Sequence, residues 1–416
     1  MTQEIQHLKT FSKWIIYSLI IGISIGTVAS LFSHTLAFVA TNFNTNPYLI
    51  YGLPFAGLLI VFLYHKAGVK KAQGTNLVFK AIHQQKTISI LMAPLIFIST
   101  ALTHLCGGSA GREGAALQLG GSIGQNLARK LKLNTNDQNL FVMCGMASAF
   151  AALFGTPITA TIFAIEVVSI GIMQYAALVP CALSSLIACQ VAHFFSCHAE
   201  HITIQTLPSF TINTAIRIAI LAILLSYLSI LFCLAMHTSH HLFEKYFPNA
   251  YLRIFVGGIL IVILTLLIGN NYNGAGMNYI IEGIEKGYIV PYAFLCKLLF
   301  TAITLGSGFK GGEIVPCFYV GGAFGLLVGP YLGIPASFAG AIGLVVLFCG
   351  VSNSPMTSLF LALELFGISN LSYFFIALSI CYMLSGYHGL YGEQKIMYSK
   401  YSTTFINHYA NQSIDL

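Results

Sequence analysis

The hydrophobic and polar positions of this chain form long apolar runs separated by short polar stretches. No Asp, Glu, Lys or Arg occurs from residue 14 to residue 65, a run of 52, or from residue 314 to residue 363, a run of 50. A helix that crosses the hydrocarbon core of a bilayer needs about 20 apolar residues. The pattern therefore predicts an all-α polytopic membrane protein. The spans that we expect are residues 14–42, 49–65, 88–107, 139–155, 157–170, 173–196, 212–240, 253–270, 289–305, 315–330, 336–350, 355–367 and 371–387.

The composition agrees with this pattern and excludes other classes of protein. Of 416 residues, only 19 are Lys or Arg and 12 are Asp or Glu, which is 7% charged. An ordinary soluble domain carries roughly 25%. The hydrophobic fraction is 56% and the mean hydropathy is +0.80. We therefore exclude soluble enzymes, disordered chains and proteins whose partner is a nucleic acid.

The distribution of Lys and Arg predicts the orientation in the membrane. Lys9 and Lys13 precede the first apolar run, and further Lys and Arg residues follow the second, whereas residues 41–48 between them have none. Because cytoplasmic loops carry the excess of Lys and Arg, the N-terminus is expected to lie in the cytoplasm. The membrane that we expect is the cell (inner) membrane. The ten Cys residues are scattered, mostly inside apolar segments, and are interpreted as buried hydrophobic residues without disulfides.

An internal repeat is the most informative feature of the sequence. Residues 107–114 (Gly-Gly-Ser-Ala-Gly-Arg-Glu-Gly) correspond to residues 308–316 (Gly-Phe-Lys-Gly-Gly-Glu-Ile-Val-Pro), about 200 residues later. In each half, a later Pro stands nine residues before a Glu: Pro157 before Glu166, and Pro355 before Glu364. Internal repeats with short, Gly- or Pro-interrupted segments indicate a transport site at the repeat interface.

We therefore expect four parts. These are an N-terminal segment (1–13), a first transmembrane repeat (14–205), a second transmembrane repeat (206–391) and a short cytoplasmic tail (392–416), which is too short for a regulatory domain.

The two Gly-rich turns are candidates for a small-anion site. Gly allows a sharp turn, and the first N–H groups of the following helix then lack partners in the helix. Those donors, with the positive end of the helix dipole, attract an anion. Residues 111–114 and 311–314 are two such helix starts, with Arg112 and Lys310 placed to concentrate anions at the mouths. The alternative is close helix packing, which is the better interpretation for the Gly120/Gly124 and Gly321/Gly325 pairs.

Glu113 is the leading candidate for the gate. An ionisable side chain within a membrane segment indicates a functional site. A carboxylate at a helix N-terminus can occupy the position of an anion when ionised and leave when protonated, so it can be both gate and proton carrier. The alternative is a charge at a helix N-terminus in a headgroup-level loop.

These residues resemble the CLC family of chloride channels and anion/proton antiporters. The resemblance rests on residues 111–114, on residues 311–316, on the two Pro-x8-Glu segments and on Tyr391 after the last span, and it extends over roughly residues 14 to 400. It implies inverted-topology repeats of broken and tilted helices, and a homodimer with a pore within each subunit. It also implies that Glu113 is the external gating glutamate and that the Tyr391 hydroxyl meets the anion.

Three departures resemble the bacterial fluoride-transporting branch of the family. Ala115 stands where chloride-type members have Pro after the gating Gly-Glu-Gly, and Glu313 with Ile314 replaces an apolar pair. The loop at Gly74-Thr75-Asn76 lacks the anion-coordinating Ser of a Gly-Ser-Gly-Ile-Pro motif.

Another departure concerns the proton route. Chloride/proton exchangers carry an internal glutamate one residue after Glu166, where this chain has Val167. The resemblance therefore implies fluoride/proton antiport, with a chloride channel or chloride/proton exchanger as the alternative. The partners expected are fluoride or chloride, protons and the lipid bilayer, with no cofactor and no metal. The anion-binding residues expected are Thr75, Asn76, Gly111, Arg112, Gly114, Glu313, Ile314 and Tyr391.

Two weaker motifs remain as alternatives. Residues 107–111 match G-x-S-x-G around Ser109, the nucleophile elbow of hydrolases, but an apolar helix rather than a strand is expected before it. An intramembrane hydrolase is therefore a distant alternative. Two groups of His could bind a metal, but their spacing fits no strong zinc pattern and polar loops explain them. These groups are His193, Cys197, His198 and His201, and His237, His240 and His241.

Overall fold

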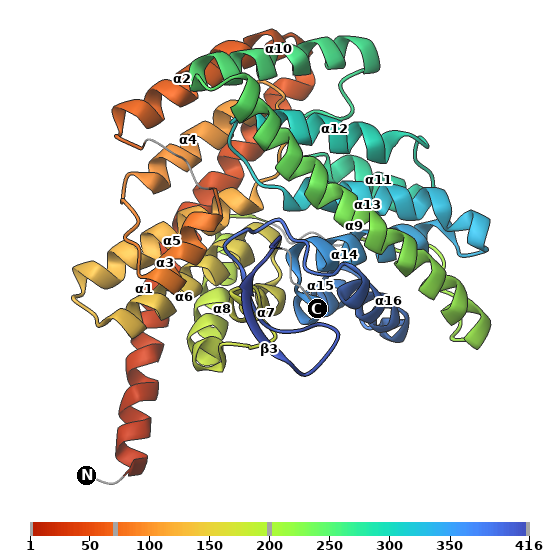
Figure 1. Cartoon of the computed structure of the whole chain (residues 1–416). Helices are drawn as coiled ribbons and strands as arrows, with labels where there is room; N and C mark the ends of the chain where they lie inside the picture. Colours follow the sequence, from red (N-terminus) through yellow and green to blue (C-terminus); the bar gives the residue numbers. More distant parts are fainter. Residues whose placement is uncertain (1–2, 70–73, 198–201, 413–416) are drawn as a thin grey trace.

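The computed structural model describes residues 3–69, 74–197 and 202–412, and this part of the chain is a bundle of helices with one small sheet (Figure 1). The first half contains α1 (Gln3–Thr45), η1 (Pro47–Gly52), α2 (Leu53–Lys66), α3 (Asn76–Gln84), α4 (Met92–Leu105), α5 (Glu113–Lys130), α6 (Thr135–Phe154), α7 (Pro157–Glu166), β1 (Ser169–Ile170), η2 (Tyr175–Ala177) and α8 (Leu178–Phe194). The second half contains α9 (Ile212–Tyr246), α10 (Ala250–Ile268), α11 (Met277–Lys286), α12 (Ala293–Gly306), α13 (Ile314–Val328), η3 (Pro330–Leu332), α14 (Ala336–Ser352), α15 (Pro355–Phe366), α16 (Leu371–Leu384), β2 (Lys395–Tyr398) and β3 (Phe405–Tyr409).

Every predicted span contains a helix. Within the described residues, six helical segments are long and apolar enough to cross a membrane, and the other apolar helices are 10–17 residues long. The helix α1 begins at Gln3, well before the apolar run, and its exposed first turns project from the body of the molecule (Figure 1). The short helices α3 and α11 and the Gly-rich α5 lie outside the predicted spans, because charged and other polar residues interrupt their apolar stretches.

The two halves repeat the same elements. The ends of α12 lie 201 residues after the corresponding ends of α4, and α14 begins 201 residues after α6. The helices α2 and α10, which are equivalent in the repeat, pack side by side at one edge of the molecule (Figure 1).

Hydrogen bonds between the halves are reciprocal as well. The N–H of Ser109 donates to Thr304 Oγ1 (3.1 Å), and the N–H of Lys310 donates to Thr103 Oγ1 (3.4 Å). Thr103 and Thr304 are equivalent residues of the two halves, so each half holds the Gly-rich turn of the other.

The two Pro-x8-Glu segments form a pair of reciprocal helix caps. Pro157 and Pro355 are the first residues of α7 and α15, and the residues before them make no side-chain cap. The Glu166 carboxylate, at the end of α7, accepts the N–H groups of Met356 (3.0 Å) and Thr357 (2.7 Å) at the start of α15.

Glu364, at the end of α15, does the same for α7. Its carboxylate accepts the N–H groups of Ile158 (3.0 Å) and Thr159 (2.8 Å) and the Thr159 hydroxyl (2.5 Å). Backbone donors at a helix start need partners where water is absent. The motif spacing therefore joins α7 and α15 head to tail across the repeat interface.

Several helical glycines allow two helices to approach closely. Gly120 and Gly124 of α5 lie against backbone carbonyls of α6, and Gly321 and Gly325 of α13 lie against backbone carbonyls of α14. A Cβ at any of these positions would collide with backbone atoms. The packing interpretation of these pairs is confirmed.

Two strands of the tail complete a three-stranded sheet with β1 of the first half, which the sequence did not indicate. The strand β1 pairs in parallel with β2, and β2 pairs antiparallel with β3. Gln394 is fully buried, and its side-chain amide donates to the carbonyls of Val167 (2.8 Å) and Ser352 (2.9 Å). Glu393 pairs with Lys80 of α3 (3.0 Å). These contacts hold the segment that carries Tyr391.

The reciprocal caps generate a prediction about stability. Glu364→Ala leaves donors at the start of α7 without partners, and it should lower the free energy of unfolding by about 2 kcal/mol or more. Glu364→Gln should lower the free energy of unfolding by less, because its amide oxygen can still accept an N–H at the start of α7. Thermal unfolding of the detergent-purified protein measures both effects. Glu282→Ala removes an exposed carboxylate that pairs with Lys286 and should change stability by at most about 1 kcal/mol. Equal effects of Glu364→Ala and Glu282→Ala would contradict the capping role.

Candidate functional site

The two Gly-rich turns meet face to face near the middle of the bundle. Gly111 and Gly312 form an isolated antiparallel bridge, in which each N–H donates to the carbonyl of the other at 2.6 and 2.7 Å. These glycines are equivalent in the repeat, with the same separation of 201 as the helices. The bridge brings the start of α5 against the start of α13. Both helix dipoles therefore place their positive ends at one buried location.

Glu113 is the first residue of α5, and its side chain is fully buried. Its Oε2 accepts the N–H of Val315 (3.2 Å), in the first turn of α13, and the N–H of Arg112 (3.1 Å). Its Oε1 has no hydrogen-bond partner in the described part of the chain and lies 3.9 Å from Arg112 Nε. The carboxylate thus sits where a bound anion would meet the donors of α13.

Helix α13 begins without a side-chain cap of its own. Glu313 is its N-cap residue, and neither its side chain nor another caps the first N–H groups. Ile314 is buried, whereas Glu313 is partly exposed. Pro316, in the same turn, has no N–H. The donor that α13 offers at Val315 is consequently available to a ligand from outside the helix, and Glu113 is that ligand in this structure.

Thr75 and Gly114 lie together on another side of the same site. Thr75 precedes α3 and is 7% exposed, and its hydroxyl lies 3.5 Å from the carbonyl of Gly114. Asn76 points elsewhere, because its Oδ1 accepts the N–H of Glu393 (3.1 Å). The start of α3 therefore contributes the Thr75 hydroxyl to the site, and Asn76 anchors the tail.

Tyr391 reaches the site from the tail. It is 2% exposed, and its ring packs against Phe79 of α3 with centroids 5.1 Å apart. Its hydroxyl interacts electrostatically with Glu313 and Glu113. The structure thus brings together Thr75, Gly111, Glu113, Gly114, Glu313, Ile314 and Tyr391.

The two basic residues before the helix starts differ in their surroundings. The Arg112 guanidinium is partly exposed and lies over the Phe154 ring, with 5.7 Å to its centroid. The Lys310 ammonium lies over the Tyr64 ring at 5.2 Å. Both are attached to the turns that meet at the bridge, so each adds positive charge close to the site.

Two residues that support the site were not predicted from the sequence. The Asn273 side chain donates to the carbonyl of Gly107 (2.7 Å), and His104 Nε2 lies 3.3 Å from the carbonyl of Gly111. Both side chains are buried. His104 stands in an apolar run nine residues before the gate and could have been noticed on that ground, but its contact is visible only in three dimensions.

The residues of the weaker motifs serve other purposes. Ser109 is fully buried, and its hydroxyl bonds with Thr301 (3.0 Å) of α12, which joins the two halves. Cys197 Sγ lies 3.6 Å from His34 Nε2. His198 and His201 lie outside the described residues. His237 Nε2 bonds with the carbonyl of Gly389 (2.9 Å), near the tail.

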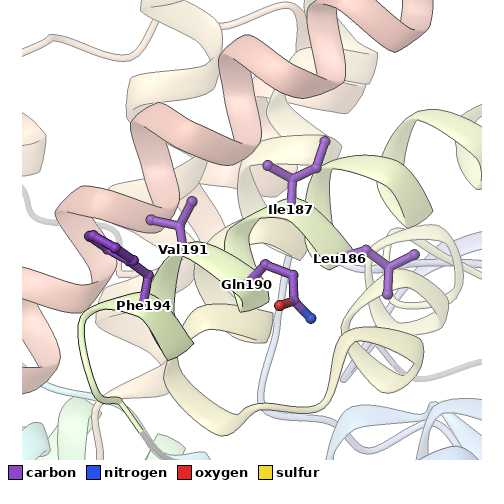
Figure 2. A pocket seen from close by; sticks show the side chains of 5 residues that line it. All are labelled: Leu186, Ile187, Gln190, Val191 and Phe194. Carbon is purple, nitrogen blue, oxygen red and sulfur yellow. The ribbon is translucent and has the colours of Figure 1, made fainter.

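A shallow apolar groove lies on the outer surface of α8, beside α1 (Figure 2). Its lining consists of Leu186, Ile187, Gln190, Val191 and Phe194. No titratable side chain lines it, so this groove offers no chemistry for an anion and suits lipid or protein contact.

The comparisons with known proteins agree with this geometry. The sequence profile described as voltage gated chloride channel matches residues 56–386. The chain belongs to this family, the CLC family. A chloride/fluoride channel protein of Pseudomonas syringae pv. tomato is 31% identical over 407 residues, which are 96% of this chain and 90% of that protein.

Solved CLC structures have the same fold. The crystal structure of a CLC-type fluoride/proton antiporter superposes with a TM-score of 0.89 at 31% identity, covering 92% of this chain and 98% of that one. A slow cyanobacterial Cl⁻/H⁺ antiporter superposes with a TM-score of 0.78 at 16% identity, covering 89% and 94%. The predicted family and the all-α, inverted-repeat membrane fold are confirmed.

The bridge between the turns generates a prediction. A Cβ added at Gly312 would lie 2.7 Å from the Gly114 nitrogen and 2.9 Å from the Glu113 nitrogen. Gly312→Ala should push the start of α5 away from α13 at a stability cost of about 1–3 kcal/mol. Anion flux should fall, because the two helix starts no longer meet at one site. Flux from proteoliposomes measures this. Gly392→Ala, where a Cβ meets nothing within 4 Å, should keep normal flux. Undiminished flux in Gly312→Ala would contradict the close contact.

Proposed function

We propose that this CLC protein is a fluoride/proton antiporter that exports fluoride, with Glu113 as gate and proton carrier. The observation that carries the proposal is the Glu113 carboxylate bound to the Val315 N–H at the start of α13. A negatively charged side chain in that position competes directly with a small anion, because both need the same backbone donor.

The competition provides the coupling between anion and proton. Ionised Glu113 is held by the N–H groups of Arg112 and Val315 and by the positive ends of two helices. A proton on the carboxyl group removes the charge that those groups stabilise. The neutral side chain then leaves, and fluoride takes the donor at Val315. When fluoride leaves, the carboxyl group loses its proton and returns, so fluoride and the ionised carboxylate alternate at one site, and each exchange moves a proton on or off Glu113.

The chemistry of the surrounding donors favours fluoride. Fluoride is small and strongly hydrated, so a site must replace its water shell with closely spaced donors. The Thr75 hydroxyl and the Tyr391 hydroxyl add to the backbone donors of α5 and α13. Arg112, Gly111, Gly114 and Ile314 line the same location, and Asn76 supports it through the tail. Two similar proteins named for fluoride, the Pseudomonas channel protein and the CLC-type fluoride/proton antiporter, support the same substrate.

The inner side differs from what a chloride/proton exchanger would need. Val167 stands at the position of the internal glutamate, and its carbonyl is bound by Gln394 of the tail. Glu313, partly exposed and close enough to Tyr391 to interact with it, is a second carboxyl group near the gate. This arrangement favours fluoride exchange over the alternative of chloride transport.

The assembly and orientation are part of the proposal. The chain is expected to form a homodimer with a pore in each subunit, in the inner membrane of a bacterial cell, with its N-terminus in the cytoplasm. Residues 14–205 and 206–391 form the two repeats, between residues 1–13 and the tail 392–416. The matched elements of the two halves support this division.

Fluoride selectivity is the first test. Liposomes with the protein should release fluoride much faster than chloride, and Thr75→Val should narrow the difference by about two- to tenfold, since a hydrogen bond contributes about 0.5–1.5 kcal/mol. Ion-selective electrodes record both fluxes. Thr27→Val removes an exposed hydroxyl that bonds within its own helix and is the matched control. Chloride release as fast as fluoride release by the unmodified protein would place it among the chloride transporters.

The gate is tested by Glu113→Gln, which keeps the shape of the protonated acid and cannot release a proton. Fluoride movement should become independent of a pH gradient, or stop if turnover requires proton exchange. Simultaneous fluoride and proton recordings distinguish these results. Glu282→Gln, whose exposed carboxylate pairs with Lys286, is the control and should remain coupled. Proton uptake driven by fluoride export that persists in Glu113→Gln would contradict the assignment.

A further inference from the structure

One peptide group connects a buried histidine to the gate. The Gly111–Arg112 peptide has its carbonyl 3.3 Å from His104 Nε2 and donates its N–H to Glu113 Oε2 at 3.1 Å. A carbonyl oxygen can only accept, so Nε2 carries the hydrogen of this bond. The imidazole and the carboxylate therefore bind opposite ends of the same peptide group.

We propose that His104 is a positioning residue that helps to hold the Glu113 carboxylate against the Val315 N–H at the start of α13. The inference rests on the proposed function, because it assumes that this carboxylate competes with the anion. A donor at the Gly111 carbonyl polarises the peptide group and makes the Arg112 N–H a stronger donor, since linked hydrogen bonds reinforce one another. The His104 bond thus stabilises the carboxylate at the start of α13 without touching it.

The repeat supplies a comparison within the same molecule. The residue 201 positions after His104 is Leu305, and the residue 201 positions after Glu113 is Ile314. The second half therefore has apolar residues at both positions, although its turn makes the same glycine bridge. The polar residues occur together in the half that carries the carboxylate, which is where a hold on that carboxylate is needed.

Burial separates His104 from solvent. Its side chain is 5% exposed, and Lys297 of α12 and Arg112 are the charged groups that interact with it electrostatically. A donor bond in such a place is worth more than in water, because no water competes for the carbonyl. The same carbonyl also accepts the Gly312 N–H at 2.7 Å, so His104 strengthens a bridge that is already formed.

The test is the affinity for fluoride, measured by titration calorimetry on the detergent-purified full chain. His104→Leu removes the donor, as does His104→Met, which serves if the Leu variant is unstable. Both should bind fluoride about two- to fourfold more tightly, because the competing carboxylate is held less firmly. This estimate takes about 30% of the free energy of a charge-assisted hydrogen bond. General damage to the site would weaken binding instead. His104→Gln keeps an N–H donor and should restore the affinity of the unmodified protein.

A double-variant comparison isolates the path through Glu113. In the Glu113→Gln background, His104→Leu should leave the fluoride affinity unchanged, because no carboxylate competes. His83→Leu is the matched control, since His83 Nε2 also bonds with a carbonyl, that of Val168 at 2.9 Å, away from the gate. Weaker or unchanged binding in both His104→Leu and His104→Met, or the same change with and without the Glu113 carboxylate, would overturn the inference.

The failure of the proposed function would look different. An unmodified protein that releases no heat with fluoride, or a Glu113→Gln variant with unaltered fluoride affinity, contradicts the competition at the gate and with it the inference about His104. If Glu113→Gln binds fluoride more tightly than the unmodified protein but the two His104 variants bind it with unchanged affinity, only the inference about His104 is contradicted.

Discussion

The first N–H groups of a helix have no partner within the helix, and inside a membrane no water replaces that partner. This constraint governs the centre of the molecule, where α5 and α13 begin at buried residues. It applies also to α7 and α15, whose first residues are partly buried. At α7 and α15, a carboxylate binds the donors with both oxygens. At α13, Glu113 binds with one oxygen, and the other lacks a hydrogen-bond partner in the described chain. A carboxylate at a helix start therefore connects two helices permanently at α7 and α15. At α13, the carboxylate is a ligand that an anion can replace.

The repeat explains the place of the site, and the departures from the repeat explain its chemistry. Two equivalent turns paired at Gly111 and Gly312 bring two helix starts together. A fully symmetric pair of carboxylates there would repel each other, and a pair of apolar residues would leave the donors without a ligand. With Glu113 in one half and Ile314 in the other, a single carboxylate meets the donors of both halves. The tail completes the arrangement, since its sheet and its bonds to α3 and Val167 fix Tyr391 beside the gate.

Much of the fold could be predicted because its signals are local in the sequence. Long apolar runs, the repeated Gly-rich turns and an isolated Glu in an apolar region identify the spans, the repeat and Glu113. The rest depends on contacts between distant residues. The role of Glu166 and Glu364 as caps, the partner of Asn76 in the tail and the contact of His104 with Gly111 follow from how the halves pack. The two-residue strand β1 is too short for any alternation to be visible, and it forms only because the tail returns to it.

The central claim is that fluoride and the Glu113 carboxylate compete for the Val315 N–H, so that anion binding and protonation are linked. Proton uptake on fluoride binding tests this claim most directly, by calorimetry in buffers with different ionisation enthalpies. The account predicts that the unmodified protein takes up a proton as fluoride binds and that Glu113→Gln binds fluoride without proton uptake. Fluoride binding with no proton uptake by the unmodified protein, or the same uptake in Glu113→Gln, would contradict it.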